Sequence, residues 1–362
     1  MERIKQEKPS YVIDWFENFK EQSEWQLLRC LTWMRPSGKL HLWHYVWALE
    51  NRKKMQDLDN VKNQFLIADY HVMWEEKDVK KTKDNIFEVV RDWLAVWLDP
   101  NKSDFVVQSY VPESAELTMF LSMLTPLSKL YNNPTLKDEI KQLDNKWMDN
   151  SNSSISTAFF NYPISQAADI LLPKADIVPV GEDQLPHIEL TRYIARQFNK
   201  KFWTNFPLPK ALVWEVSRLV WTDWKSKMSK SLWNAIMLSD SKSDIYKKVK
   251  SMYTDPNRIR ATDPWKVEWN VVFMYLDVFM KDWDNLIELK NRYREWRISD
   301  MELKNILTEI LDTFISPIRE KRKEFDDDRV IWNIIQDGSE RARLIAIQTM
   351  NELKKCMWIL RY

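Results

Sequence analysis

Short apolar runs alternate with longer amphipathic segments over the first two-thirds of the chain. Four runs are typical of buried strands and cover Gln26–Thr32, Gln64–Ala68, Asp104–Gln108 and Asp176–Val180. Apolar residues recur with helical spacing in the neighbouring segments His44–Leu58, Val79–Leu98, Glu113–Leu130 and Gln184–Phe198. Strands that alternate with helices indicate a parallel sheet with helices on both faces. We therefore predict an α/β, Rossmann-like fold for this part of the chain.

The last third of the chain has only helical periodicity. Strand signals end near Ser239, and between Met301 and Ile318 apolar residues repeat every three or four positions, as on one face of a helix. We predict three parts. They are an N-terminal extension over residues 1–25, a Rossmann-type domain over 26–238 and a helical domain over 239–362.

Composition narrows the class of protein. Of 362 residues, 44% are hydrophobic and 30% charged, and no apolar run approaches the roughly 20 residues needed to span a bilayer. Met1–Ser10 is charged and has no apolar stretch of the kind found in secretory signals. Cys30 and Cys356 indicate neither a disulfide framework nor a zinc site, so we expect no metal ligands and a cytoplasmic protein. The net charge is only +1, so nucleic-acid binding would need a local basic patch.

The first candidate site is the segment Arg35–His44, Arg-Pro-Ser-Gly-Lys-Leu-His-Leu-Trp-His. It follows a predicted strand and begins a predicted helix, which places it at the carboxyl edge of the sheet, where α/β proteins bind ligands. A helix N-terminus favours phosphate, and His41 and His44 add two donors. A metal site and a purely structural histidine pair are the alternatives. The absence of further ligands around the His-x-x-His pair disfavours a metal.

The second candidate site is Lys225–Ser231, in which three lysines and three serines surround one methionine. It lies on a predicted loop between a strand and a helix. Lysine is a mobile point charge that can follow a polyphosphate during reaction. By itself, such a run is more often a solvated basic loop.

Together these two segments resemble the signatures of class I aminoacyl-tRNA synthetases, His-x-Gly-His and Lys-Met-Ser-Lys-Ser. Trp43 stands where the family has glycine. The resemblance extends from about residue 28 to the end of the chain. The segments that resemble tryptophanyl-tRNA synthetases in particular are Ala167–Leu172, Asp176–Gln184, His187–Arg192, Met252–Asn257 and Gly338–Arg343.

The resemblance implies a two-step reaction. The tryptophan carboxylate attacks the α-phosphate of ATP to give tryptophanyl-adenylate and pyrophosphate, and the acyl group then passes to tRNA(Trp). It also implies Mg²⁺ held mostly by the ATP phosphates. The catalytic residues that it implies are His41, His44, Lys227 and Lys230. The ATP-binding residues that it implies are Arg35, Pro36, Ser37, Trp43, His44, Gly181, Glu182, Asp183, Leu219, Lys227, Met228, Ser229, Lys230 and Ser231.

The resemblance also implies a tryptophan site. Asp169 matches the family carboxylate that accepts the indole N–H, and Tyr162 and Gln184 match residues near the α-amino group. A buried carboxylate built for one N–H can reject phenylalanine by roughly 10⁴-fold or more, because phenylalanine leaves it unpaired.

The resemblance further implies that the helical third binds the tRNA anticodon and that the protein is a homodimer. A basic cluster, Arg319, Lys321, Arg322 and Lys323, could contact phosphate there. The alternative for this cluster is a solvated face.

Three alternative functions remain open. A tyrosyl-tRNA synthetase shares the fold and both signatures, although Asp176–Gln184 and Asp169 disfavour it. A small nucleotidyltransferase can also carry His-x-Gly-His, although the helical third and the lysine loop disfavour it. A non-catalytic tRNA-binding relative would follow if Trp43 is a genuine, inactivating change.

Tryptophan stands at several positions where this family has glycine. The chain has 20 Trp and only 3 Gly, whereas glycine averages about 7% of residues. Trp93, by contrast, lies where the family has tryptophan. Our hypothesis is that the source organism decodes UGA as glycine. It predicts UGA codons at Trp33, Trp43, Trp47, Trp97, Trp221, Trp224, Trp233 and Trp265, and UGG at Trp93.

Overall fold

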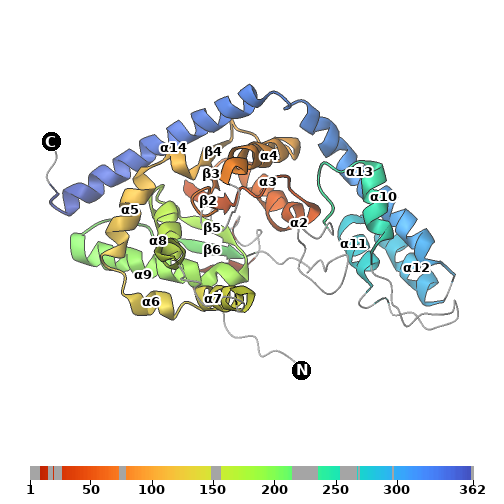
Figure 1. Ribbon diagram of the computed structural model, residues 1–362, viewed down its shortest axis with the longest axis horizontal. Coiled ribbons are helices and arrows are strands. Elements are labelled where there is room, and N and C mark those ends of the chain that lie inside the picture. The colour runs from red at the N-terminus through yellow and green to blue at the C-terminus, as the bar shows by residue number, and fades with distance from the viewer. Residues whose placement is uncertain are drawn as a thin grey trace.

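A six-stranded parallel sheet with helices on both faces forms the centre of the molecule (Figure 1). The computed structural model describes residues 9–14, 19, 27–72, 79–147, 156–213, 235–252, 267, 270–295 and 297–359, with only the backbone given for 14, 79 and 142–147. The architecture confirms the predicted α/β, Rossmann-like fold with a helical C-terminal region.

The sheet has the order β1-β6-β5-β2-β3-β4, and all neighbouring strands are parallel. The strands are β1 (Val12–Asp14), β2 (Leu28–Met34), β3 (Val61–Ile67), β4 (Ser103–Val107), β5 (Ile177–Val180) and β6 (Lys210–Val213). The four predicted strands are confirmed as β2, β3, β4 and β5. The sequence pattern does not predict β1 and β6, because their three and four residues are too few to show a period.

Helices connect the strands and cover both faces of the sheet. They are α2 (Leu42–His44), α3 (Glu50–Gln56), α4 (Thr82–Ala95), α5 (Glu113–Ser122), α6 (Leu127–Tyr131), α7 (Pro134–Trp147), α8 (Thr157–Leu171) and α9 (Leu185–Phe202). A π-helical turn, Tyr45–Leu49, joins α2 to α3. Short 3₁₀ turns cover Val79–Lys81, Gln108–Tyr110 and Glu182–Gln184.

Successive side chains of β3 pack into two different cores. Phe65 and Ile67 join the core beneath α3, α4 and the helical region, whereas Leu66 joins the core beneath α5, α8 and α9. This alternation is expected because neighbouring side chains of a strand point to opposite faces of the sheet. Both faces are apolar, as is usual in a parallel sheet covered on both sides.

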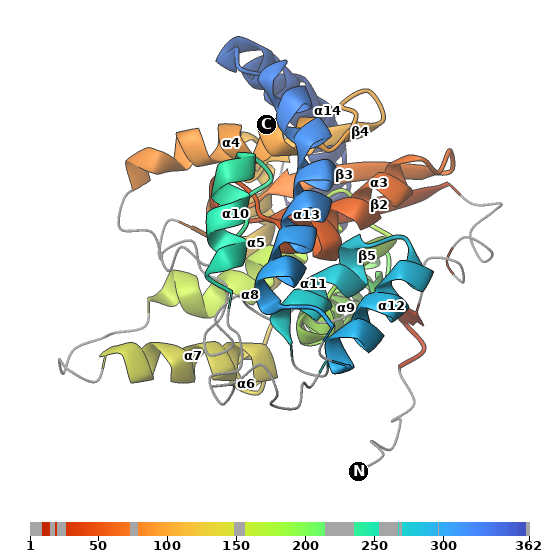
Figure 2. The same ribbon diagram turned by 90° about the vertical axis from the view of Figure 1, so that its right-hand side faces the viewer.

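Four helices lie together at the right-hand end of the molecule in Figure 1 and face the viewer in Figure 2. They are α10 (Lys242–Lys250), α11 (Val271–Phe279), α12 (Trp283–Arg294) and α13 (Asp300–Lys323). Helix α13 begins at a Ser299 side chain that accepts a hydrogen bond from the Glu302 N–H, which stabilises the first turn. The predicted apolar stripe is buried along this helix, from Leu303 to Ile318.

The last helix, α14 (Asp328–Cys356), returns to the sheet and runs along its β4 edge (Figure 1). The Val107 N–H donates to Ser339 Oγ at 3.2 Å, and Arg341 Nε donates to Asp104 Oδ1 at 2.6 Å. A Cβ atom on Gly338 would lie 2.4 Å from the Phe105 carbonyl oxygen, so only glycine allows this approach. Among the described residues, no helix is long and apolar enough to cross a membrane.

Candidate active site at the carboxyl ends of β2 and β5

The strand order changes direction between β2 and β5. From β2 the chain continues to β3 and β4 on one side, whereas β5 leads to β6 and β1 on the other. The two central strands pair only through Cys30 and Ile177, so their carboxyl ends diverge. Ligands of α/β proteins bind in the crevice at such a switch point.

A crevice of about 240 Å³ lies at this switch point. Its walls come from the end of β2, from the helix that follows Arg35–His44 and from the end of β5. The lining residues are Thr32, Trp33, Trp47, Ala48, Asn51, Arg52, Pro179, Val180, Gly181, Asp183 and Gln184. Of the predicted site residues that the structure describes, only Gly181, Asp183 and Gln184 line this crevice, whereas Asp169 borders a separate small cavity together with Gln108.

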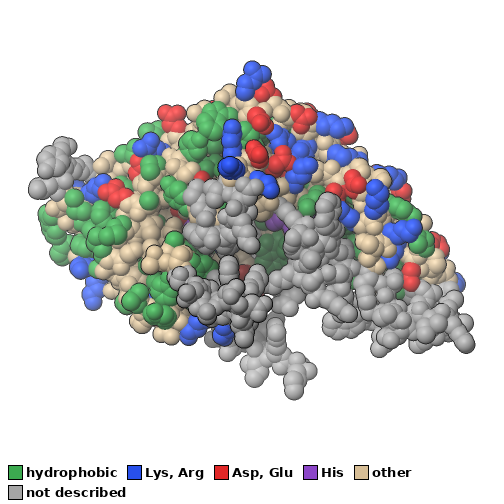
Figure 3. All heavy atoms as spheres, in the orientation of Figure 1, with side chains coloured by type: hydrophobic (Ala, Val, Ile, Leu, Met, Phe, Trp, Pro, Cys, Tyr) green, Lys and Arg blue, Asp and Glu red, His purple; other side chains and the backbone are tan. Residues whose placement is uncertain are grey.

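His41 and His44 form a compact pair at the start of α2. Their rings stack with centroids 3.8 Å apart, and the His41 backbone N–H donates to His44 Nδ1 at 3.2 Å. Because Nδ1 accepts this bond, the His44 proton lies on Nε2 in the neutral ring. Figure 3 shows histidine side-chain surface near the middle of this face. Arg35, Pro36 and Ser37 lie immediately before this pair, in the loop after β2.

The second signature lies outside the described residues, as do all its candidates: Leu219, Lys227, Met228, Ser229, Lys230 and Ser231. The chain that leaves it is described and pairs with the histidine segment. The Leu42 N–H donates to the Ile236 carbonyl oxygen and the Leu238 N–H to the Leu40 carbonyl oxygen, each at 2.9 Å. His41 and Met237 are partners in this antiparallel bridge.

Asp169 on α8 is a buried carboxylate outside the crevice lining, with 6% of its surface exposed. Gln108 Nε2 donates to Asp169 Oδ2 at 2.7 Å, and His71 Nε2 lies 3.9 Å from the same oxygen. Burial raises the pKa of Asp169 to about 8, the Gln108 hydrogen bond opposes this shift, and Asp69 adds to it. The carboxyl group is therefore poised near neutral pH.

Two buried histidines border the same region. Burial lowers the pKa of His71 to about 3 and that of His187 to about 4, and the nearby Arg35 guanidinium contributes to both shifts. Both rings are neutral at pH 7, so His71 forms no ion pair with Asp169. His187 Nε2 lies 3.2 Å from the Tyr162 hydroxyl.

The segment after β5 supplies the other wall of the crevice. Gly181 ends the extended backbone, and Glu182–Gln184 form a 3₁₀ turn. Asp183 and Glu182 are exposed, and Gln184 Nε2 donates to Asp183 Oδ2 at 2.8 Å. The Asp183 backbone carbonyl accepts from Thr135 Oγ1 at 2.9 Å, which ties the turn to α7.

The chain was compared with known proteins. The family model described as tRNA synthetases class I (W and Y) matches residues 25–316. A tryptophan–tRNA ligase of Clostridium longisporum is 45% identical over 334 residues, which are 91% of this chain and 96% of the relative. One from Streptococcus pneumoniae serotype 4 is 45% identical over 335 residues, covering 90% and 96%. The chain belongs to the tryptophan–tRNA ligase family of class I tRNA synthetases.

Solved structures agree with this assignment. The tryptophanyl-tRNA synthetase of Campylobacter jejuni, complexed with ADP and tryptophan, superposes with a TM-score of 0.79 and 33% identity. The match covers 92% of this chain and 100% of that one. This chain is therefore an enzyme of the tryptophan–tRNA ligase family, and the alternative functions are not favoured.

Two of the polar residues around Asp169 were not among the predicted site residues. His71 follows β3 in Ala-Asp-Tyr-His, and Gln108 follows β4. Both stand just beyond the carboxyl ends of strands that were predicted. Polar residues at that position of adjacent parallel strands are the signal that could have found them, because such ends share one sheet edge.

Indole side chains stand inside the candidate site. Trp33 and Trp47 line the crevice, and Trp43 stacks on Trp47 with centroids 5.5 Å apart. A Cβ atom on Gly181 would lie only 2.6 Å from Trp47 Cζ2. At this volume the crevice is smaller than the roughly 300–1,000 Å³ of typical ligand sites.

The basic cluster of α13 is paired with acidic groups. Arg322 binds Asp92 and Glu88, Arg319 binds Asp312, Lys321 binds Glu324 and Lys323 binds Glu320. Figure 3 shows blue and red side chains interleaved over the same end of the molecule. The cluster is thus a paired surface rather than an unopposed positive patch.

Proposed function

We propose that this enzyme activates L-tryptophan with ATP at the β2–β5 crevice and transfers it to tRNA(Trp). A carboxylate oxygen of tryptophan attacks the α-phosphorus of ATP, and the bond to pyrophosphate breaks. A ribose hydroxyl of the tRNA end then attacks the acyl carbon, and AMP leaves. The observation that carries the proposal is the buried Asp169 carboxyl, with Gln108 and His71 beside it, in a chain of this family.

Asp169 is the group that we assign to the indole N–H. Gln108 already donates to Oδ2, so Oδ1 is the acceptor available in this assignment. A tyrosine or phenylalanine ring has no N–H at this place and would leave the buried carboxyl unpaired. Tyr162 and Gln184 would contact the α-amino group.

The two signatures would bind the triphosphate. His41, His44 and the Arg35–Ser37 segment would contact the ATP, and Gly181 and Asp183, which line the crevice, would meet the ribose. Lys227 and Lys230, together with Leu219, Met228, Ser229 and Ser231, would close over the leaving pyrophosphate. Among the described residues no cluster of three His, Cys, Asp or Glu could hold a metal. Mg²⁺ would therefore be held by the ATP phosphates and would neutralise their charge.

The nucleotide needs more room than the crevice offers with indoles at positions 33 and 47. Glycine at positions 33, 43 and 47 would remove three indole rings from this end of the site. We therefore propose that the active enzyme has glycine at these positions, by the UGA hypothesis stated above.

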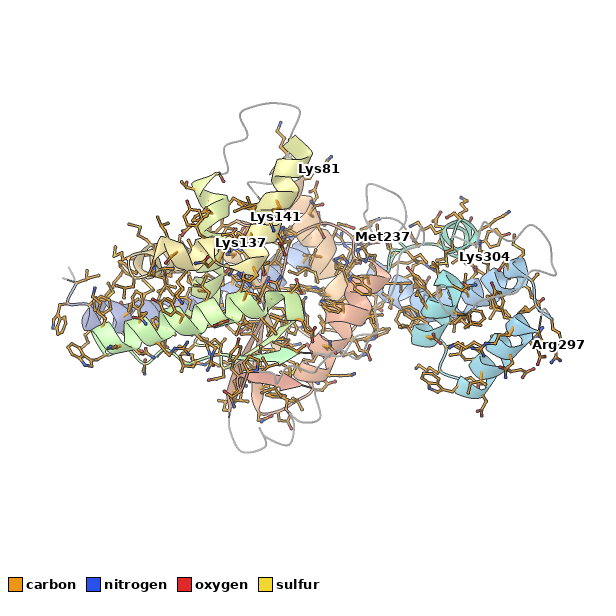
Figure 4. The ribbon with its side chains drawn as sticks, turned by 90° about the horizontal axis from the view of Figure 1, so that it is seen from below. Lys81, Lys137, Lys141, Met237, Arg297 and Lys304 are labelled. Carbon is orange, nitrogen blue, oxygen red and sulfur yellow. The ribbon has the colours of Figure 1, made fainter. Side chains whose placement is uncertain are left out.

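We further propose a homodimer that works in the cytoplasm with its tRNA. Its interface would be formed by the large apolar side chains that α5 and α6 expose on one side. Met119 is 60% exposed, Met123 58%, Leu127 63% and Tyr131 60%. Met119 lies on α5 and Met123 is the residue that follows this helix, whereas Leu127 and Tyr131 lie four residues apart on α6. We call these four side chains the apolar stripe. Lys137 and Lys141 lie on the adjacent α7 (Figure 4).

Aminoacylation of a tRNA(Trp) transcript tests the proposal. The enzyme, made from its coding sequence with glycine at every UGA codon, should charge this transcript with tryptophan. It should not charge a tRNA(Tyr) transcript with tyrosine. Charging with tyrosine alone would replace the proposal by a tyrosyl-tRNA synthetase, and tRNA binding without charging would favour the non-catalytic relative.

A further inference from the structure

Two arginines one turn apart near the end of α13 bond to segments that adjoin the two signatures, Arg322 to helix α4 and Arg319 to the turn 237–240. Arg322 Nε donates to Asp92 Oδ1 at 2.6 Å, and its Nη2 binds Glu88. Both acceptors belong to α4. The Asp92 side chain is fully buried, and that of Arg322 is 12% exposed. A buried carboxylate is stable only when it is paired, so Arg322 is the partner that keeps Asp92 in place.

The other oxygen of Asp92 binds the backbone of the histidine signature. The Leu40 N–H donates to Asp92 Oδ2 at 2.6 Å, and Leu40 immediately precedes His41. Asp92 therefore joins the α13 guanidinium to the residue that begins the signature. Burial raises the pKa of Asp92, and Arg322 and the Leu40 N–H oppose that shift, so both partners favour its charged form.

Arg319 holds the segment that leaves the lysine signature. Its Nη1 donates to the Asp240 carbonyl oxygen at 2.6 Å, and its Nη2 to Asp312 Oδ1 at 3.1 Å. The Asp240 side chain accepts from the Met237 N–H at 2.8 Å and from Lys248 Nζ at 2.6 Å. Arg319 thus fixes a turn, 237–240, whose first residue pairs with His41.

The two sets of contacts, which we call arms, run from Arg322 through Asp92 and from Arg319 through Asp240. Both end at one short antiparallel bridge. Leu40–Leu42 and Ile236–Leu238 are hydrogen-bonded to each other, and each is also tied to α13 through one arginine. Figure 4 shows Met237 between the sheet domain and the helical region. The histidine pair and the segment 236–240, which follows the lysine signature in the sequence, are therefore both anchored to α13.

We propose that Arg319 and Arg322 are positioning residues for the activation step, which hold the histidine signature and the paired segment 236–240 in a fixed arrangement. They touch no substrate and act through Asp240 and Asp92. The proposal rests on the proposed function, since it concerns the ATP half of that site. A displacement of about 1 Å in a catalytic group can cost up to about a hundredfold in rate, so a clamp of this kind has a measurable effect.

Arg322→Gln tests the first arm, with Arg91→Gln as the matched control. Arg91 joins the same helix α4 to the α13–α14 connection, through the Phe325 carbonyl at 2.8 Å and Asp328 at 2.6 Å. It contacts neither Leu40 nor the 236–240 segment in any bond described here. We expect Arg322→Gln to lower kcat/KM for ATP in tryptophan-dependent exchange by about tenfold or more, with tryptophan affinity unchanged. Arg91→Gln should change it less than about twofold, because Arg91 shares only Glu88 with Arg322 and has no bond to Leu40 or to the 236–240 segment.

Arg319→Gln tests the second arm and leaves the Asp92 pair intact, so it answers the question if Arg322→Gln does not fold. It should show the same selective loss toward ATP. Equal losses in Arg91→Gln, or a parallel loss of tryptophan affinity, would overturn the proposal and leave a purely structural contact.

Amide hydrogen exchange without substrates separates this proposal from the proposed function. In Arg322→Gln the Leu40 amide and the peptide that contains 236–240 should exchange faster than in the unaltered enzyme, whereas in Arg91→Gln they should not. Unchanged exchange would refute the clamp. Faster exchange in an enzyme without tryptophan-dependent activity would support the clamp and count against the proposed function alone.

Discussion

In our proposal, Asp169 is the residue on which the choice of amino acid depends. It lies in the apolar core of α8, with Gln108 and His71 as polar neighbours, and burial raises its pKa to about 8. An indole N–H aimed at the carboxyl favours its charged form. Tryptophan binding should therefore release a proton below pH 8.

This linkage predicts how tryptophan binding depends on pH. The dissociation constant for tryptophan should fall as the pH rises from 6 toward 8, because the bound state prefers the ionised carboxyl. Asp169→Asn should flatten the profile in this range, and Asp169→Ala should weaken binding by about 10- to 100-fold, the usual value of a charge-assisted hydrogen bond. Calorimetric titration at several pH values measures both effects. Parallel profiles for the unaltered and Asn variants would remove Asp169 from the indole contact.

Site residues could be predicted from the sequence where one short segment carries several functional side chains. His41 and His44 are three positions apart and were found from the strand-to-helix context. His71 and Gln108 are isolated polar residues, 37 positions apart, and only the parallel pairing of β3 and β4 brings their strand ends together. Their proximity is a property of sheet order, which no local pattern contains.

At the scale of the element, tryptophan side chains conflict with the backbone conformation at the ends of helices. Among the described residues, four that are not glycine have a left-handed φ, and three of these are Trp97 at 64°, Trp203 at 51° and Trp358 at 50°. Each follows the end of a helix, α4, α9 or α14. Glycine is the usual residue there, because a Cβ atom costs about 1–2 kcal/mol in this conformation. Trp97 was among the predicted UGA positions, and the backbone adds the other two.

Replacing these three tryptophans by glycine should stabilise the protein. We expect the free energy of unfolding of the triple variant to rise by about 3 kcal/mol, the sum of three relieved left-handed residues. Trp283→Gly is the control. This side chain is 63% exposed at the first turn of α12, where the backbone φ is not left-handed. It should gain nothing. Denaturant titration measures the stability of both variants. A destabilised triple variant would contradict the hypothesis. So would UGG codons at the eight predicted positions and at Trp203 and Trp358.

Helices were easier to predict from the sequence where the amphipathic segment was long. The long amphipathic segments became α4 and α13, with boundaries shifted by a few residues. The π-helical turn Tyr45–Leu49 was not predicted, because a search for 3.6-residue periodicity cannot register one inserted residue. Such turns are frequent at functional sites, and this one directly follows His44.

At the scale of the whole molecule, the apolar stripe on α5 and α6 has no cover within the described chain. Met119 on α5, Met123 directly after it, and Leu127 and Tyr131 on α6 are all more than half exposed. Such a surface is typical of a contact between subunits. The β4 edge of the sheet, by contrast, is covered, because α14 packs on it. The sequence alone could not reveal this packing.

If a second copy of the chain binds to this stripe, negative charges placed on the stripe should disrupt the dimer. Met123→Glu together with Leu127→Glu should give a monomer in analytical ultracentrifugation at micromolar concentration. Leu344→Glu is the matched control, because Leu344 is 59% exposed on α14, away from the stripe. It should leave the dimer intact. A monomeric unaltered enzyme, or a dimer that survives the double change, would place the interface elsewhere or abolish it.

Amino-acid-dependent ATP–pyrophosphate exchange tests tryptophan activation at the β2–β5 crevice most directly. The enzyme with glycine at its UGA codons should exchange with tryptophan at least about a hundredfold faster than with tyrosine or phenylalanine. The chain with tryptophan at positions 33, 43 and 47 should be inactive, because indoles fill the nucleotide side of the crevice. Exchange with tyrosine at or above the tryptophan rate would contradict the assignment of Asp169 and the proposed substrate together.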